Sequence, residues 1–586
     1  MSAGPPPMAR AEALLSSGRA AEAKDIAQRF LRQRPGDLAA QRLLARAHYA
    51  LGEREQALFF LKACVAAAPD DAALRVNLAR LQHAAGDGDG ALQQLREAVG
   101  RAPAFARART DLVQLLIERS MLSEALRVSA DASGSMDAEL AAQRVQVLML
   151  AGDAEGALAE ARRIAAADPR SPGFAIALAM ASNYADLPAA EVFGVHTRAG
   201  ALLEVGAPDM RSAFDGRDRS PDRTINVGVL SSDMRTHSVA YFFEPLLGAI
   251  DQERFPVTVY HTNRVEDATT ARLKAVARRW REMPRAYPAD CVRRILDDRI
   301  DVLIDLAGYT NAAGVSVMAA KPAPVQATYL GYPNTIGLPR IDARLVDSRT
   351  DPAGSEALAT EKLLRLDPCF VCYGPPTDAP PVPPRAGGRP VAFGSFNATL
   401  KITPRAAGMW RRALDATPGS RMIIKASNFV EADLREAARA RLAGMGLPMD
   451  RVEVLEAKMS SREHLETYGR VDVALDTYPY HGTTTTCEAM WMGVPVVTLA
   501  GDRHVSRVGV SLLNAVGLPD LVAQSEDEYV RIASALAADK ARLAGLRASL
   551  RERVRTSPLC DAPAFARRFE DALRALWRAW CGRASA

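Results

Sequence analysis

The sequence contains no apolar run long enough to cross a membrane and no segment typical of a secretion signal. Its apolar stretches stay short of the roughly 20 residues that a membrane-spanning helix requires. The first residues, MSAGPPPMARAEALL, lack a charged start and a long apolar core. Basic runs are also missing, and the net charge of +5 is the small difference between 74 basic and 69 acidic residues. We therefore expect neither a membrane nor a nucleic acid as a partner.

Disulfide bonds, metals and redox cofactors are not expected either. The seven cysteines are odd in number and scattered: Cys64, Cys291, Cys369, Cys372, Cys487, Cys560 and Cys581. This usage argues against a disulfide framework and for a reducing, cytoplasmic location. Cys369 and Cys372 form a lone CxxC without a second ligand pair nearby. No G-x-G-x-x-G motif opens a strand–helix unit, so a dinucleotide is not indicated.

The length and composition indicate a multidomain globular protein. A chain of 586 residues is too long for one hydrophobic core and suggests about three or four domains. Its 48% hydrophobic and 24% charged residues are typical of a soluble protein.

Self-similarity with a period of 34 residues marks the N-terminal part. That spacing separates Gly18, Gly52 and Gly86, then Ala23, Ala57, Ala91 and Ala125, and then Pro35, Pro69 and Pro103. Each unit reads as a helix, a Gly-containing turn, a second helix that begins at a small Ala, and a Pro that ends it. The pattern resembles the tetratricopeptide repeat, with about five units over residues 9–182. Stacked units typically bind peptides or proteins on a concave face; a structural or dimerising array is the alternative.

From Thr224 the pattern changes to β-branched runs that alternate with amphipathic helices. Strands are predicted at INVGVLSSD, FPVTVYH, DVLIDLAGYT, VQATYLGYP and ARLVDS, and then at PVAFGSF, SRMIIKAS, VEVLE, VDVALDT and VPVVTLA. This alternation predicts two parallel sheets, each with its ligand crevice at the strand C-termini. The predicted parts are a repeat array (9–182), an exposed transition (183–223), a first lobe (224–373), a Pro-rich linker (374–390), a second lobe (391–560) and a C-terminal helix (561–586).

Polar residues follow the predicted strands of both lobes. They include His237, Thr310, Gly331, Tyr332, Pro333 and Asn334 in the first lobe and Asn397, Lys401 and His464 in the second. Loops that follow parallel strands meet at one edge of a sheet, so these residues are expected in one cleft. Taken singly, His237 could cap a helix and Lys401 could be a solvated surface lysine.

The stretch HGTTTTCEAMWMGVPVV, residues 481–497, predicts a loop and a helix after a strand. Hydroxyls and free N–H groups at a helix start attract anions, because the unsatisfied donors and the positive end of the helix dipole point the same way. A phosphate is the expected guest. The alternative is an ordinary threonine N-cap.

Several segments in order resemble the O-linked N-acetylglucosamine transferase family. They are SSDMRTHS, DLAGYT, PAPVQATYLGYP, FNATLKITP, LDTYPYHGTTTTCEAMWMGVPVVT and SRVGVSLL, which follow the repeats. The resemblance covers nearly the whole chain and is close to bacterial members. It implies an α + α/β fold: a tetratricopeptide superhelix followed by a GT-B catalytic region of two Rossmann-like lobes. In such enzymes a C-terminal helix often crosses back to the first lobe, and PAFARRFEDALRALWRAW is expected to do so.

The resemblance also implies an activity and site residues. The activity is transfer of N-acetylglucosamine from UDP-GlcNAc, a substrate rather than a cofactor, to Ser or Thr of proteins. His237 matches a general base or donor-orienting residue, and Lys401 matches a lysine on the diphosphate. Nucleotide-binding positions are Asn397, Lys401, Met459, Ser460, Ser461, His464, Thr483, Thr484, Thr485 and Glu488. Positions on the sugar and acceptor side are Thr310, Gly331, Tyr332, Pro333, Tyr480 and His481.

Some positions depart from the family pattern and concern the donor. Glu488 stands where an aspartate holds the ribose, and Ser461 replaces a ribose-contacting lysine. Tyr480 replaces a cysteine near the sugar, and Ala398 replaces a phosphate-binding glutamine. These departures leave the donor sugar open.

The same residues suggest a mechanism. Negative charge grows on the diphosphate as UDP leaves, and Lys401 and the N–H groups after Gly482 would stabilise it without a metal ion. The acceptor hydroxyl would attack the opposite face and invert the anomeric carbon. Other readings are a different nucleotide sugar such as GDP-fucose, an Asn or non-protein acceptor, or an inactive repeat scaffold. The sequence leaves the oligomeric state open.

Overall fold

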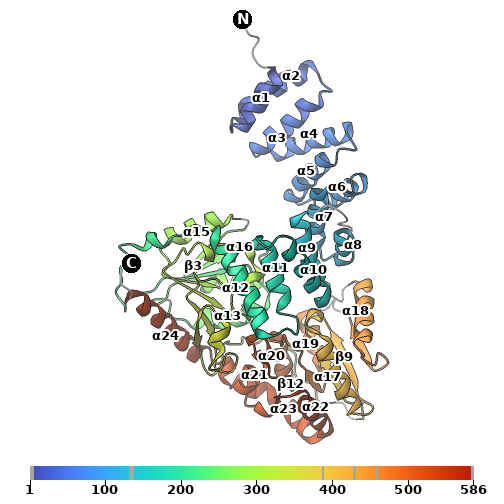
Figure 1. Cartoon of the computed structure of the whole chain (residues 1–586), viewed down its shortest axis with the longest axis vertical. Helices are drawn as coiled ribbons and strands as arrows, with labels where there is room; N and C mark the ends of the chain where they lie inside the picture. Colours follow the sequence, from blue (N-terminus) through green and yellow to red (C-terminus); the bar gives the residue numbers. More distant parts are fainter. Residues whose placement is uncertain are drawn as a thin grey trace. The chain divides into compact units, whose positions relative to one another are not determined.

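The computed structural model describes residues 6–130, 137–284, 286–385, 388–426, 431–456 and 460–582. The chain forms two compact units, Met1–Val147 and Leu148–Ala586 (Figure 1). The first unit consists of repeat helices. The second holds the last repeat helices and two α/β lobes. Within the described residues, no helix is long and apolar enough to cross a membrane.

The N-terminal helices pair as the repeat pattern predicts. They are α1 (Pro7–Ser16), α2 (Ala20–Gln33), α3 (Leu38–Ala50), α4 (Arg54–Ala67), α5 (Ala72–Ala84), α6 (Gly88–Arg101), α7 (Ala106–Glu118), α8 (Leu122–Ala130), α9 (Ala138–Leu150), α10 (Ala154–Ala167), α11 (Pro172–Ser182) and α12 (Ala189–Val205). The alanines near the start of the second helices, Ala23, Ala57, Ala91 and Ala125, are fully buried. A larger side chain at these positions would push the paired helices apart.

The turns within the pairs require a left-handed residue. Gly18, Gly52 and Gly86 have φ angles of +81°, +77° and +89°, a conformation that glycine adopts without strain. In the fourth pair the same position holds Ser120, whose φ is +57°. The repeat therefore keeps its backbone where its glycine is lost.

Helix α12 lies in the stretch that the sequence predicts as an exposed transition. His196 on α12 is fully buried, and Asn183 just after α11 is 1% exposed. The prediction of an exposed linker over 183–223 is therefore wrong for its first half. The helix was missed because its apolar residues include many alanines, which mark an amphipathic face only weakly. Residues 211–224 are mostly exposed, as expected.

The first lobe is built on a parallel sheet with the strand order β3-β2-β1-β4-β5-β6-β7. Its strands are β1 (Val227–Ser231), β2 (Val257–His261), β3 (Arg279–Glu282), β4 (Val302–Asp305), β5 (Val325–Tyr329), β6 (Ala343–Val346) and β7 (Lys362–Arg365). Its helices are α13 (Ser238–Ala249), α14 (Ala268–Val276), α15 (Pro288–Asp297) and α16 (Ala312–Ala319). The sequence missed β3 and β7, which are edge strands with polar sequences.

The second lobe is also a parallel sheet, with the order β10-β9-β8-β11-β12-β13. Its strands are β8 (Ala392–Ser395), β9 (Arg421–Lys425), β10 (Val452–Leu455), β11 (Val473–Leu475), β12 (Val496–Leu499) and β13 (Val522–Ala523). Its helices are α17 (Pro404–Asp415), α18 (Ala432–Gly444), α19 (Ser461–Thr467), α20 (Thr484–Trp491), α21 (Val508–Ala515), α22 (Glu526–Ala538) and α23 (Lys540–Arg555).

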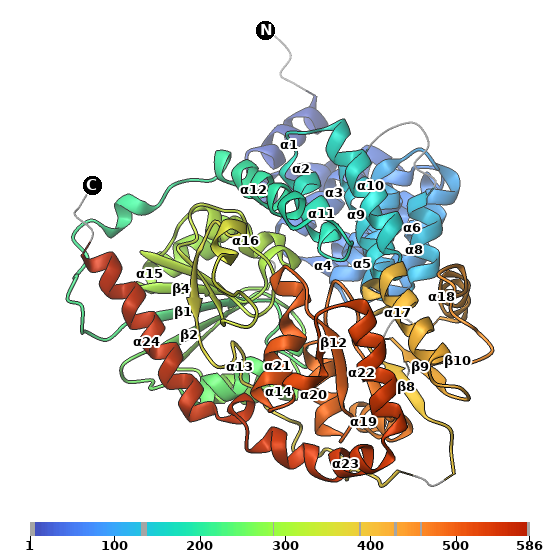
Figure 2. The same cartoon turned by 60° about the horizontal axis from the view of Figure 1, so that its bottom comes forward.

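The last helix, α24 (Ala562–Cys581), returns to the first lobe, as predicted. Figure 2 shows it lying along that lobe beside α13. Phe565, Phe569 and Trp577 belong to the core of the first lobe and are at most 2% exposed. The Trp577 Nε1–H group also donates to the Ser220 carbonyl oxygen at 3.1 Å. The helix therefore joins the end of the chain to the first lobe.

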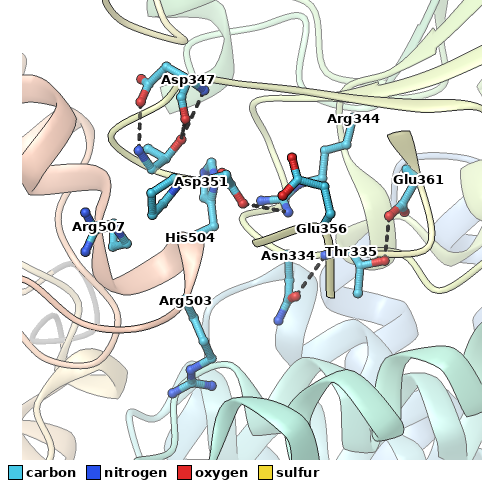
Figure 3. Close-up of polar contacts among 12 residues, drawn as sticks. Asn334, Thr335, Arg344, Asp347, Asp351, Glu356, Glu361, Arg503, His504 and Arg507 are labelled. Carbon is cyan, nitrogen blue, oxygen red and sulfur yellow. Dashed lines mark hydrogen bonds and ion pairs between the residues drawn. The ribbon is translucent and has the colours of Figure 1, made fainter. Parts of the chain in front are cut away.

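A buried ionic group also joins the two lobes (Figure 3). His504 lies in the short helix η6 (His504–Ser506) of the second lobe. Its Nδ1 atom is 2.5 Å from the Oδ2 atom of Asp351 in the first lobe. Arg344 of the first lobe approaches the other oxygen of Asp351 at 3.6 Å. Nearby, the Ser511 hydroxyl of the second lobe donates to Asp347 of the first. These contacts fix the lobes against each other.

Candidate active site

A cavity of about 570 Å³ lies between the two lobes. Its wall includes twelve residues that the sequence singled out: His237, Gly331, Asn397, Lys401, Ser460, Ser461, His464, Tyr480, Thr483, Thr484, Thr485 and Glu488. Most of them follow the C-terminal ends of parallel strands, where open α/β sheets bind ligands. Met459 lies outside the described residues.

The threonine loop forms one end of the cavity. Thr483 is the N-cap of α20, but its side chain makes no capping hydrogen bond. Thr485 donates to the side-chain oxygen of Asn397 at 2.9 Å, whereas the buried hydroxyl of Thr484 has no hydrogen-bond partner among the residues that the structure describes. The ordinary N-cap alternative is therefore not supported, and the start of α20 presents donors to the cavity.

Lys401, in the short helix η4 (Thr399–Lys401) after β8, carries the positive charge at this end. Its ammonium donates to the His481 carbonyl oxygen at 2.9 Å and lies 4.1 Å from the ring centroid of Tyr480. Burial lowers the pKa of Lys401 to about 8, against a raising effect of Asp476. A bound diphosphate would favour the charged form again.

A chain of three charged or polar side chains forms the other end of the cavity. The Lys425 ammonium is 2.6 Å from Nδ1 of His464, and Nε2 of His464 is 3.0 Å from a carboxylate oxygen of Glu488. Since Lys425 can only donate, His464 carries its proton on Nε2 and donates it to Glu488. Sequence reasoning missed Lys425. A lysine at the C-terminal end of the buried strand β9 is the signal that could have found it.

His237 lies on the first-lobe side and serves two purposes. It caps α13, because its Nδ1 accepts the Val239 N–H at 3.3 Å, and it lines the cavity. Burial lowers the pKa of His237, although Asp233, 3.9 Å away, raises it. With Nδ1 occupied as an acceptor, the neutral ring carries its proton on Nε2. That nitrogen can donate a hydrogen bond but cannot take a proton.

Four residues expected on the sugar and acceptor side are not part of the cavity wall. The Tyr332 hydroxyl points to the repeat helices, where it bonds to Asn183 at 2.7 Å and to His196 at 2.8 Å. Thr310 donates to a backbone carbonyl in its own turn, and Pro333 is partly buried outside the wall.

His481, the fourth of these residues, holds the loop from inside. It is fully buried, and its Nε2 lies 3.0 Å from the Leu499 carbonyl oxygen while Nδ1 accepts the Gly509 N–H. These contacts hold the His481 backbone where its carbonyl oxygen accepts the hydrogen bond from the Lys401 ammonium. Sequence spacing marks such residues as near the site but does not give the direction of their side chains.

No group of three or more His, Cys, Asp or Glu residues in the described part of the chain is arranged to hold a metal ion. The seven cysteines are all unpaired.

Comparison with known proteins shows the family and the fold of the chain. The chain matches the model of glycosyl transferase family 41 over residues 210–373 and 386–569, and tetratricopeptide repeat models over 14–81 and 59–118. A solved structure of a mutant O-GlcNAc transferase from Thermobaculum terrenum is similar over 99% of both chains, with 30% identity and a TM-score of 0.59. The predicted fold, repeat helices followed by a GT-B region, is thereby confirmed.

Curated plant proteins are also similar to part of the chain. One is the probable UDP-N-acetylglucosamine–peptide N-acetylglucosaminyltransferase SPINDLY of Arabidopsis thaliana, 41% identical over 62% of this chain and 40% of its own length. Another is the probable UDP-N-acetylglucosamine–peptide N-acetylglucosaminyltransferase SEC of the same plant, which is 28% identical over 61% of this chain and 38% of its own length. The chain thus spans about two fifths of the length of these relatives. With more than half of its residues matched by the family model, the chain belongs to glycosyl transferase family 41.

Proposed function

We propose that this protein transfers N-acetylglucosamine from UDP-GlcNAc to Ser or Thr hydroxyls of proteins. The activities after which the similar proteins are named support this donor and acceptor. The observation that carries the proposal is that one cavity is lined both by Lys401 and the start of α20, which suit an anion, and by His464 and Glu488, which suit a nucleoside. A nucleoside diphosphate has this distribution of charge and hydrogen-bonding groups.

The residues divide the work of catalysis as follows. Charge that develops on the leaving diphosphate is stabilised by the Lys401 ammonium and by the free donors at the start of α20, which are already in place before reaction. His237, with its proton on Nε2, orients the donor through a hydrogen bond. The acceptor hydroxyl attacks the anomeric carbon from the face opposite the diphosphate, the bond from that carbon to UDP breaks, and the hydroxyl proton passes to a phosphate oxygen, so the product is inverted. Because these donors already face the diphosphate end, we also propose that no divalent ion is required, and chelation with EDTA should leave the rate unchanged.

The acceptor is proposed to be a protein or peptide held by the repeat helices, and the reaction to take place in the cytoplasm. The match of the N-terminal helices to tetratricopeptide repeats supports the first point. The seven unpaired cysteines support the second.

The direct test presents a Ser/Thr peptide library to the protein with UDP-GlcNAc and, in parallel, with GDP-fucose. Mass spectrometry then identifies which sugar is added and to which residue. Modification of Ser or Thr with UDP-GlcNAc supports the proposal. Transfer only from GDP-fucose, or only to Asn, would replace its donor or acceptor. Nucleotide binding by calorimetry without any transfer would favour a different acceptor, and no binding at all would favour a scaffold.

Replacement of Lys401 by Ala tests the anion end. We expect transfer to fall by about 100-fold or more, because a preorganised charge on the leaving group is lost, while the melting temperature stays close to that of the wild type. Lys540→Ala, at an exposed position of the same lobe, is the matched control. Near-wild-type turnover of Lys401→Ala would remove the role given to this lysine.

A further inference from the structure

The segment that follows α11 reaches both lobes beside the cavity. Asn183, at the end of α11, accepts a hydrogen bond from Asn334 of the first lobe at 2.8 Å and donates to the hydroxyl of Tyr332. The next residues turn to the second lobe, where Arg503 donates to the Ala185 carbonyl oxygen at 3.1 Å. Figure 3 shows Arg503 extending away from His504 toward these helices.

Tyr184, between these two contacts, stacks on a residue of the cavity wall. Its ring centroid lies 4.7 Å from that of Tyr480, and the two planes are 9° from parallel. Tyr480 in turn lies under the ammonium of Lys401, 4.1 Å from its ring centroid. A ring stacked this closely covers one face of Tyr480, so the lysine lies over the other face. The three side chains form a column from the repeat helices to the anion end of the cavity.

The column has a physical consequence for Lys401. The lysine makes no described hydrogen bond to a carboxylate; its partners are the Tyr480 ring and the His481 carbonyl oxygen. Both partners belong to one short loop segment, and Tyr184 covers the outer side of that segment. Removing the Tyr184 ring would free Tyr480 to turn and would admit water beside the ammonium.

We propose that Tyr184 is a positioning residue for Lys401, which it holds at the diphosphate end of the cavity through the ring of Tyr480. The inference rests on the proposed nucleotide-sugar transfer and extends it, because it makes the end of the repeat array part of the catalytic apparatus. Nothing in the sequence pattern marks Tyr184, since it lies in the stretch predicted as a linker.

The experiment compares Tyr184→Ala, Tyr184→Phe and the control Tyr287→Ala, whose tyrosine is 78% exposed on the first lobe. The readouts are kcat and KM for UDP-GlcNAc with the library peptide that the wild type modifies fastest, and melting temperature. For Tyr184→Ala we expect kcat to fall about three- to tenfold, the range that an aromatic contact typically carries. Tyr184→Phe keeps the stacked ring and loses only the hydrogen bond between the hydroxyls of Tyr184 and Tyr480, so kcat should stay close to that of the wild type. Tyr287→Ala should behave as the wild type.

A pH profile separates positioning from mere stabilisation. Lys401 must be charged to act, so kcat/KM of the wild type should fall as pH rises through the pKa of about 8 that burial gives this lysine. If water enters in Tyr184→Ala, that alkaline limb should move to higher pH. If Tyr184→Ala has the kcat and the alkaline limb of the wild type, the inference is overturned. It is also overturned if Tyr184→Ala loses the same fraction of kcat/KM at every pH and has a lower melting temperature. If the wild type transfers no sugar and binds no UDP, the proposed function itself fails.

Discussion

At the scale of single residues, Lys425 orients His464 in the part of the cavity that we propose holds the nucleoside. Its ammonium lies 2.6 Å from Nδ1 of His464, which leaves Nε2–H to reach Glu488. Burial lowers the pKa of Lys425, and Glu488 acts against that change. The Glu488 carboxylate thus favours the charged form of Lys425, although His464 lies between the two side chains. Ser461, which carries no charge, lines the same cavity.

Lys425→Met should therefore weaken binding of the nucleoside part of the donor. Loss of a hydrogen bond that involves a charged group costs about 1.5–3 kcal/mol, or roughly 10- to 100-fold in the Kd of UDP. Inorganic pyrophosphate, which needs only the end near Lys401, should bind as before. Calorimetry with both probes measures this. Lys362→Met, at an exposed position of the first lobe, is the control, and an unchanged Kd for UDP would refute the role.

Residue positions could be predicted from the sequence where the strand order alone decides them. Lys401, Asn397 and His464 were predictable because a loop after a parallel strand must open at the ligand edge. The direction of a side chain within such a loop was not predictable. Tyr332 illustrates this limit, because its hydroxyl is engaged by Asn183, a partner 149 positions away in the chain.

At the scale of elements, the repeat turns show what a backbone conformation demands. Gly18, Gly52 and Gly86 adopt left-handed φ angles, and Ser120 adopts +57° at the equivalent place. A non-glycine residue in this region costs about 1–2 kcal/mol, which glycine avoids at an entropic cost of about 0.5–1 kcal/mol. The strain term is the larger of the two.

Ser120→Gly should consequently stabilise the repeat unit by about 0.5–1 kcal/mol, the difference between these two terms. Gly52→Ser makes the reverse change in the second helix pair and should destabilise the array by a similar amount. Urea unfolding of the full chain, followed through the repeat transition by circular dichroism, measures both variants. A loss of stability in Ser120→Gly would mean that its hydroxyl contributes more than its backbone strain costs.

Elements with a strong pattern were predictable, including the edge strand β10, whereas the edge strands β3, β7 and β13 were not. The ten predicted strands carry β-branched or apolar residues because both faces of a parallel sheet are covered. The edge strand β3 reads RWRE and is exposed at both of its ends, so it has no apolar run to detect. The two-residue strand β13 is too short to leave a periodic signal.

At the scale of the whole molecule, the buried ionic group between the lobes links their association to pH. Burial alone would raise the pKa of Asp351, but the charges of His504 and Arg344 and hydrogen bonds from His504 and Thr350 outweigh it and hold the pKa well below its usual range. Burial lowers the pKa of His504. Both groups bind protons more weakly in the folded protein than in the unfolded chain, so both stabilise the fold at neutral pH.

Stability should thus fall as the pH is lowered. His504 contributes fully to the free energy of unfolding above its unfolded pKa of about 6.5, and Asp351 does so above its unfolded pKa of about 3.9. Each contribution is lost as the pH falls from the unfolded pKa of the group toward its lower pKa in the folded protein. Asp351→Asn should lower the free energy of unfolding at pH 7 by about 3–5 kcal/mol, and its difference from the wild type should shrink in acid. Urea titrations at several pH values measure this. Asp502→Asn, 67% exposed beside the same loop, should change stability by less than about 0.5 kcal/mol.

The return of α24 to the first lobe has a consequence for synthesis on the ribosome. Phe569 and Trp577 complete the core of a lobe whose last strand, β7, ends at Arg365. Translation proceeds at about 5–20 residues per second, so that lobe waits for its final helix while the entire second lobe emerges. Its apolar face stays open during that interval, which makes it a natural client for a chaperone. The two lobes are separate in architecture, yet the first becomes native only after the second has been made.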